Sequence, residues 1–136
     1  MFIIKKILNS ATNAPEPVRL ATDASQAYKY GTLLILKGGK AKNVTFGETP
    51  THIAGETLSA GERVSILCYP LTSDLLIRTT IEGSPTSIKA GDKVALGFDD
   101  DEFADKVIND TEEGIATVVD IRGAKKNGDY VYVMFK

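Results

Sequence analysis

The sequence predicts an all-β protein, namely a small β-barrel or sandwich with an extended N-terminal arm. Val, Ile and Thr make up 34 of the 136 residues, and β-branched side chains are enriched in strands. Twelve glycines supply turns, while Trp is absent. From residue 30 onward, turn residues separate short apolar runs about every eight to twelve positions, as in sandwiches and barrels. The length suits one globular unit, so we predict an arm over residues 1–27 and a single β-domain over 28–136.

The predicted arm rests on the segment 9–17, where two prolines among small polar residues favour extended backbone. Its apolar side chains can add strands or hydrophobic contacts to a neighbouring protein or to the parent sheet. We expect such an arm to be removable, as residues 1–17, without unfolding the domain. A terminus without any role is the alternative. The predicted binding residues of the arm are Phe2, Ile3, Ile4, Ile7 and Leu8.

Seven strands are predicted in the β-domain, each a run of β-branched and aliphatic residues between turn signals. The first run ends at residues 37–40 (Lys-Gly-Gly-Lys), whose glycines permit the positive φ of a hairpin turn. Residues 127–128 (Asn-Gly) are a second two-residue hairpin signal. Residues 104–109 fit a helical turn or a short strand, and both remain open. The predicted strands are Thr32–Leu36, Asn43–Phe46, Arg63–Tyr69, Asp74–Ile81, Lys93–Phe98, Gly114–Ile121 and Tyr130–Phe135.

One pattern recurs at residues 61–66, 91–96 and 128–133: Gly, acid, any residue, Val, any residue, aliphatic. Glycine allows a backbone conformation that β-carbons disfavour, and the acid can accept a hydrogen bond from nearby backbone N–H groups. The intervals of 30 and 37 residues are too unequal for a solenoid or propeller. The pattern therefore predicts one kind of turn, used three times within a single barrel.

The distribution of charged residues argues against nucleic-acid binding and against a membrane-spanning helix. A net charge of −2 disfavours a general nucleic-acid binder, which needs excess Lys and Arg to displace counterions from phosphates. The longest uncharged stretch, 64–73, is half of the roughly 20 residues that a membrane-spanning helix needs. Two lysines interrupt the apolar N-terminus, so no secretory signal is predicted and an intracellular location is expected. Six basic residues lie near turns and are either solvated or meet an acidic partner: Lys37, Lys40, Lys42, Arg122, Lys125 and Lys126.

No catalytic site is predicted. Cys68 lies in an apolar run, where burial raises the pKa of a thiol, so a nucleophilic pair with His52, the single histidine, is disfavoured. One Cys and one His are too few for zinc. The acidic run 99–102 with Asp105 offers oxygen ligands to calcium, yet it lacks the spacing of a calcium-binding loop, so a solvated loop is favoured. We therefore expect a protein with no catalytic residue, no metal and no cofactor, which is not an enzyme.

The stretch from about Tyr28 to Lys136, four fifths of the chain, resembles the small all-β head decoration, or capsid cement, proteins of tailed bacteriophages. The likeness lies in the segments 88–96 and 114–120, the turn and strand at 127–133, and the preceding arm. The resemblance implies a non-enzymatic structural protein, made in the host cytoplasm, that binds the outer surface of the assembled capsid in the virion. It implies the major capsid protein as partner, a homotrimer, and an arm laid across neighbouring capsid subunits.

Two other functions remain open. A small β-barrel module that binds a glycan or a cellular protein would use the loops 47–60 and 98–113 for recognition. An enzyme fragment would hold a metal at residues 99–105. Tyr28, Tyr30 and Tyr69 fit either a subunit interface, where aromatics are enriched, or the core.

Overall fold

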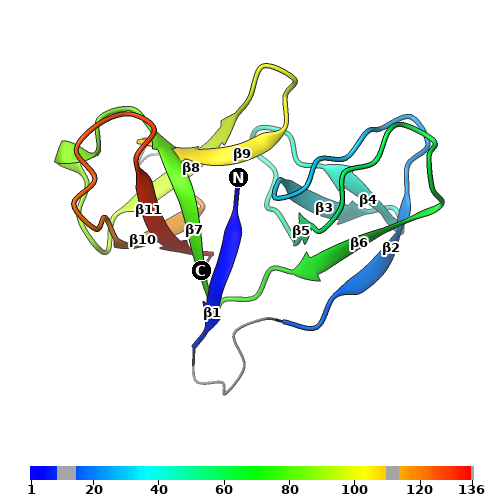
Figure 1. Cartoon of the computed structure of the whole chain (residues 1–136), viewed down its shortest axis with the longest axis horizontal. Helices are drawn as coiled ribbons and strands as arrows, with labels where there is room; N and C mark the ends of the chain where they lie inside the picture. Colours follow the sequence, from blue (N-terminus) through cyan, green and yellow to red (C-terminus); the bar gives the residue numbers. More distant parts are fainter. Residues whose placement is uncertain (9–14, 110–113, 136) are drawn as a thin grey trace.

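The computed structural model describes residues 1–8, 15–109 and 114–135, and within them it confirms an all-β fold. These residues form eleven strands and a single-turn 3-10 helix at Pro85–Ser87. The strands build two closed five-stranded barrels that lie side by side (Figure 1). We name them the N-terminal barrel, made of β2 to β6, and the C-terminal barrel, made of β7 to β11.

The N-terminal barrel has the strand order β2-β4-β3-β5-β6. A parallel pairing of β2 with β4 and an antiparallel pairing of β2 with β6 close it. The predicted hairpin turn at 37–40 is confirmed, because Lys37 pairs with Lys40 and the two glycines between them have φ values of 60° and 76°. Its second strand is β4 at Lys40–Asn43, and the predicted strand at Asn43–Phe46 is wrong. The strands are β2 (Val18–Thr22), β3 (Leu33–Lys37), β4 (Lys40–Asn43), β5 (His52–Ala54) and β6 (Ser65–Pro70).

The C-terminal barrel has the order β7-β11-β10-β8-β9, and a parallel pairing of β7 with β9 closes it. Residues 104–108, open between helix and strand from the sequence, form β9. The prediction of a two-residue hairpin at 127–128 is wrong, because a longer loop joins β10 to β11. Residues 126–129 form a four-residue turn within this loop. The strands are β7 (Leu75–Glu82), β8 (Lys93–Phe98), β9 (Ala104–Ile108), β10 (Ala116–Asp120) and β11 (Tyr130–Met134).

The recurring Gly-acid pattern is confirmed as one kind of turn. Gly61, Gly91 and Gly128 have φ values of 73°, 96° and 89°. In each turn the acid's backbone N–H donates to the carbonyl three residues earlier, and its carboxylate accepts the N–H of that same residue. The sequence pattern missed a fourth copy at residues 45–48, where no Val-x-aliphatic strand follows the acid. The turn is thus set by three or four local residues, independently of the barrel it serves.

The two barrels share one hydrophobic cluster. Successive side chains of β3 point to opposite faces of the strand. Leu34 therefore points into the N-terminal barrel, while Leu33 packs into the cluster that fills the C-terminal barrel. Ile53 of β5 does the same beside Ala54. These strands are therefore buried on both faces, which accounts for their continuous apolar runs. The sequence predicted one barrel or sandwich in residues 28–136, and the structure has two barrels with a common core.

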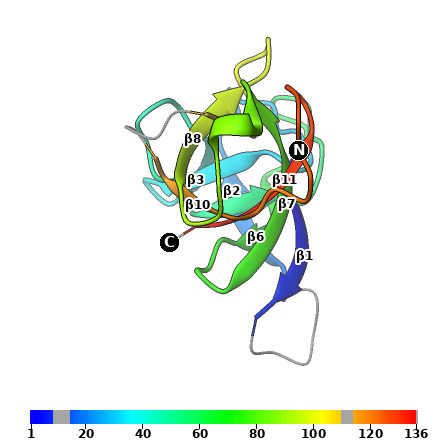
Figure 2. The ribbon, with the colours of Figure 1, turned by 90° about the vertical axis from the view of Figure 1, so that its left-hand side faces the viewer.

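The extended N-terminal arm is not confirmed. Its first part forms β1 (Ile3–Ile7), which pairs antiparallel with β7 of the C-terminal barrel, and its last part forms β2 of the N-terminal barrel. Figure 2, in which the C-terminal barrel faces the viewer, shows β1 at the margin of that barrel. Phe2 is 2% exposed and belongs to the shared cluster. Deleting residues 1–17 would therefore remove core contacts and β1, contrary to the expectation from the sequence that the arm can be removed without unfolding the domain.

The N-terminus ties the barrels together. The Met1 ammonium donates to the carbonyl of Asp105 in the C-terminal barrel, and the Phe2 N–H donates to the carbonyl of Gly31, which leads into the N-terminal barrel, at 2.7 Å. A third link is the ion pair of Lys29 with Asp99, 3.0 Å between Nζ and Oδ2. The prolines of 9–17 predicted an arm, and residues 9–14 lie outside the described residues. The composition did not show that the residues before them form a strand on the C-terminal barrel.

Candidate functional site

The edge of β1 is the main candidate for partner binding. β1 ends the six-stranded sheet and has β7 as its only strand partner among the described strands. It lies between the two barrels (Figure 1), so its second edge faces a groove of about 140 Å³ at their junction. The groove is lined by Phe2, Ile3, Ile4, Pro15, Tyr30, Ile53, Ala54 and Tyr69.

The predicted arm residues divide into two groups in the structure. Phe2, Ile3 and Ile4 lie together at the groove, while Ile7 and Leu8 lie at the far end of β1. Phe2 is buried, and Ile4 and Ile7 pack half-buried against the shared cluster. Leu8 is half-buried, and its N–H donates to the Asp74 carbonyl at 2.9 Å. These side chains hold β1 in place, and their role in binding a partner stays a prediction.

A register irregularity between Ile4 and Lys6 leaves Lys5 and Lys6 exposed on β1. Lysines and bulges on an edge strand oppose indiscriminate pairing with other chains. The apolar part of the groove, beside Phe2, Ile3 and Ile4, lies before this irregularity. An extended segment of a partner can thus approach β1 at Ile3 and Ile4. Farther along the strand, the charges of Lys5 and Lys6 disfavour such pairing.

The three tyrosines named from the sequence have different places. Tyr30 is 46% exposed and Tyr69 is half-buried, and both line the groove. Tyr28 is a core residue, whose hydroxyl donates to the Ala41 carbonyl at 2.6 Å and accepts the N–H of Asp23 at 2.9 Å. Burial raises the pKa of Tyr28. The remaining groove walls, Ile53 and Ala54, belong to β5, a three-residue strand too short to give a periodic signal.

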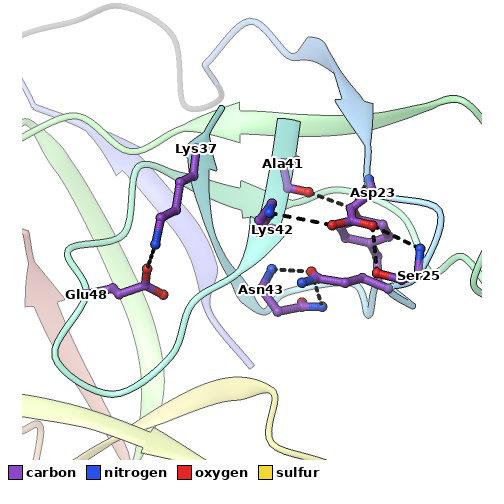
Figure 3. Close-up of polar contacts among 9 residues, drawn as sticks. Asp23, Ser25, Lys37, Ala41, Lys42, Asn43 and Glu48 are labelled. Atoms are coloured by element: carbon purple, nitrogen blue, oxygen red, sulfur yellow. Dashed lines mark hydrogen bonds and ion pairs between the residues drawn. The ribbon is translucent and has the colours of Figure 1, made fainter. Parts of the chain in front are cut away.

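Two of the basic residues expected to meet an acidic partner are paired within the chain (Figure 3). The Nζ of Lys37 lies 3.1 Å from Glu48 Oε2, and that of Lys42 lies 3.6 Å from Asp23 Oδ2. Arg122 forms a third pair, 2.9 Å from its Nε to Asp120 Oδ2. These contacts reduce the charge that the predicted basic surface can offer to a partner.

Glu48 makes folding sensitive to acid. Hydrogen bonds from the Thr45 hydroxyl and N–H, with one from Lys37, lower the pKa of Glu48 from 4.5 to about 2. Because its pKa is lower in the folded state, the Glu48 carboxylate contributes its full stabilisation of the fold above about pH 4.5. This contribution is lost as the pH falls toward 2. We expect Glu48→Gln to cost about 1 kcal/mol or less at neutral pH and nothing near pH 2, measured by urea unfolding across the range. The control is Glu62→Gln in the equivalent turn, where Glu62 accepts the Ser59 N–H at 3.3 Å. An equal pH dependence in the two variants would contradict the assignment.

The structure separates the candidate catalytic residues. Cys68 is buried inside the N-terminal barrel, and burial raises the pKa of its thiol to about 11. His52 lies opposite Pro70 rather than Cys68 in the β5–β6 pairing, and burial lowers its pKa. Such a thiol is a poor nucleophile, and no base is aligned with it.

The acidic run does not gather into a metal site in the part of the chain that the structure describes, where no three His, Cys, Asp or Glu side chains come together. The carboxylate of Asp99 instead accepts the N–H groups of Asp101 and Phe103, each at 2.9 Å, and pairs with Lys29. It shapes its own loop and joins the barrels. The segments 47–60 and 98–113, predicted as recognition loops, include β5 and β9 respectively.

Comparison with known proteins identifies no relative: no protein-family model, curated protein or solved structure matches the chain. Within the described residues, no helix has the length and apolar character needed to cross a membrane.

Proposed function

We propose that the chain is a non-enzymatic structural protein that binds the outer surface of an assembled bacteriophage capsid and stabilises it by bridging capsid subunits. The observation that carries this proposal is the edge of β1 with which no described strand pairs, beside an apolar groove between two barrels. An exposed strand edge binds an extended segment by main-chain hydrogen bonds, and neighbouring pockets take its alternate side chains. The proposed occupant is an extended segment of the major capsid protein.

The position of β1 favours binding without much reordering. Phe2 is locked in the shared cluster, and the β1–β7 pairing fixes the strand before a partner arrives. Binding to a preformed edge avoids the entropy cost of ordering a free arm. In this proposal β1 presents a rigid edge, whereas the resemblance implied an arm that is laid across capsid subunits.

The bridging role follows from the paired barrels and from self-association. A shared hydrophobic cluster makes the two barrels one stiff unit that can contact more than one capsid subunit. If the protein is a homotrimer, as we propose, the second and third contacts become intramolecular and avidity rises without new chemistry. The net charge of −2 supports a protein partner rather than nucleic acid.

Sedimentation velocity with phage capsids that lack their own decoration protein tests this proposal. We expect a trimer that co-sediments with capsids at a fixed ratio. Tyr30→Ser removes an exposed groove wall and should weaken binding about tenfold or more, as expected for a buried interface tyrosine. The matched control is Phe46→Ser, because Phe46 is 66% exposed and lies outside the groove.

Two results would contradict the proposal. A protein that sediments with no capsid at all would overturn capsid binding and favour a module for a glycan or a cellular protein. Loss of binding in Phe46→Ser but not in Tyr30→Ser would place the contact away from the β1 edge. Both variants change surface side chains, so the circular dichroism of each should match that of the parent protein.

A further inference from the structure

A second surface depression lies on the C-terminal barrel, on the outer face of β7 and β11. Its volume is about 270 Å³. Arg78 of β7 lies opposite Ile3 of β1 on one side and Tyr132 of β11 on the other. Arg122 reaches the same depression from the loop after β10. The depression is thus lined by two arginines together with Tyr130 and Tyr132.

Each guanidinium lies over an aromatic ring. The guanidinium carbon of Arg78 is 4.4 Å from the centre of the Tyr130 ring, and that of Arg122 is 4.5 Å from the centre of the Tyr132 ring. Stacking uses the flat face of a guanidinium and leaves its in-plane N–H groups available for hydrogen bonds. The rings therefore orient the two arginines without satisfying their donors.

Arg78 lacks the partners that other arginines of the chain have. Arg19 pairs with Glu56 and Arg122 with Asp120, but none of the described residues pairs with the Arg78 side chain. Its Nε is buried and has no hydrogen-bond acceptor. An unsatisfied buried donor on a charged group is unfavourable in a folded protein, and such groups are rare. The Nη groups of Arg78, which are not among these buried atoms, are the donors that an acceptor from outside the chain can reach at the depression.

The charges at the depression fit a singly charged acceptor. The charge of Arg122 is compensated by Asp120. Asp129 also lines the depression, but its Oδ2 accepts the N–H groups of Lys125 and Lys126 at 2.9 and 3.2 Å. Arg78 thus remains as the positive charge without a direct partner. The backbone N–H groups on Asp129 leave its negative charge in place, so a singly charged carboxylate, which matches the planar fork of a guanidinium, is repelled less than a dianionic phosphate.

We propose that this depression binds the carboxylate of an Asp or Glu side chain in a partner protein, through the Nη groups of Arg78, whose guanidinium stacks on the Tyr130 ring. Tyrosine and arginine are the residues that dominate protein interfaces energetically. The inference goes beyond capsid binding and does not require it, because the depression shares no lining residue with the β1 groove.

Nuclear magnetic resonance of the arginine Nε–Hε groups tests the site directly in the full chain. The probe is a capped Gly-Glu-Gly peptide, and the neutral control is capped Gly-Gln-Gly. We expect a saturable shift of the Arg78 Hε signal with the Glu peptide alone. Arg78→Lys keeps the charge but loses the bidentate fork, so the dissociation constant should rise about tenfold. The matched control is Arg63→Lys, since Arg63 is exposed and outside the depression.

Three results would overturn the assignment. The first is the absence of a saturable shift with the Glu peptide, and the second is an equal response to the Gln peptide. The third is tighter binding of a capped phosphoserine peptide, which would identify a dianion site. The backbone amide spectrum of Arg78→Lys should keep the parent pattern, so that lost binding is not lost folding. None of these results depends on whether the protein sediments with capsids.

Discussion

Phe2→Ala is expected to lower the free energy of unfolding by about 3–5 kcal/mol, the usual cost of truncating a buried phenylalanine. Phe2 is enclosed in the cluster that both barrels share, and its ring packs edge-on against Phe135 with 5.9 Å between ring centres. Truncation leaves a cavity where β1, the groove and the C-terminal barrel meet. For a chain of this size, such a loss is a large part of the total stability.

Urea unfolding followed by circular dichroism measures this change. Phe46→Ala is the matched control, because the same side chain is removed from an exposed site and should cost about 0.5 kcal/mol or less. A Phe2→Ala protein within 1 kcal/mol of the parent would restore the free arm predicted from the sequence. The result also decides how a deletion of residues 1–17 is interpreted. If Phe2 is needed for folding, the deletion would abolish the proposed capsid binding by unfolding the protein and would not locate the contact.

Leu33→Ala is expected to cost about 2–5 kcal/mol and to loosen both barrels together. Leu33 belongs to β3 of the N-terminal barrel, is fully buried, and packs in the cluster that fills the C-terminal barrel. A cavity at this position weakens the contact between the barrels as well as the barrel that carries the residue. Hydrogen exchange reports both effects, through amides of β6 in one barrel and of β11 in the other.

The control for Leu33→Ala is Leu36→Ala on the same strand, because Leu36 is 44% exposed. We expect little change in exchange from this second variant. If Leu33→Ala loosened β6 and left β11 protected, the two barrels would be independently stable domains. A common loss of protection would support the single β-domain predicted for residues 28–136.

The two proposed binding surfaces differ in how closely they are coupled to stability. The β1 groove shares Phe2 with the core, so changes inside it affect folding and binding together. Tyr30 avoids this coupling because it is partly exposed. The Arg78 depression lies on the outer face of the C-terminal barrel, and its buried unsatisfied Nε is a feature that stability alone does not explain.

The sequence by itself determined the local structure. The run of apolar residues at Lys93–Phe98 became β8 with the predicted bounds. The Gly-Gly hairpin and the Gly-acid turns formed where they were predicted, because positive φ at glycine and a carboxylate three residues from an N–H are short-range requirements. The burial of Cys68 also followed from its apolar neighbours.

Only the tertiary structure decided which strands pair and what each face packs against. Period-two alternation shows that a strand has a buried face, but it does not identify the partner of that face. Hence the first strand was predicted as an arm although it pairs with β7, some 70 residues away. Leu33 and Leu34 point into different clusters for the same reason. The surroundings of the Arg78 guanidinium are also a tertiary feature. Its stacking on Tyr130 arises only because β7 pairs with β11, which lies about 50 residues later in the chain.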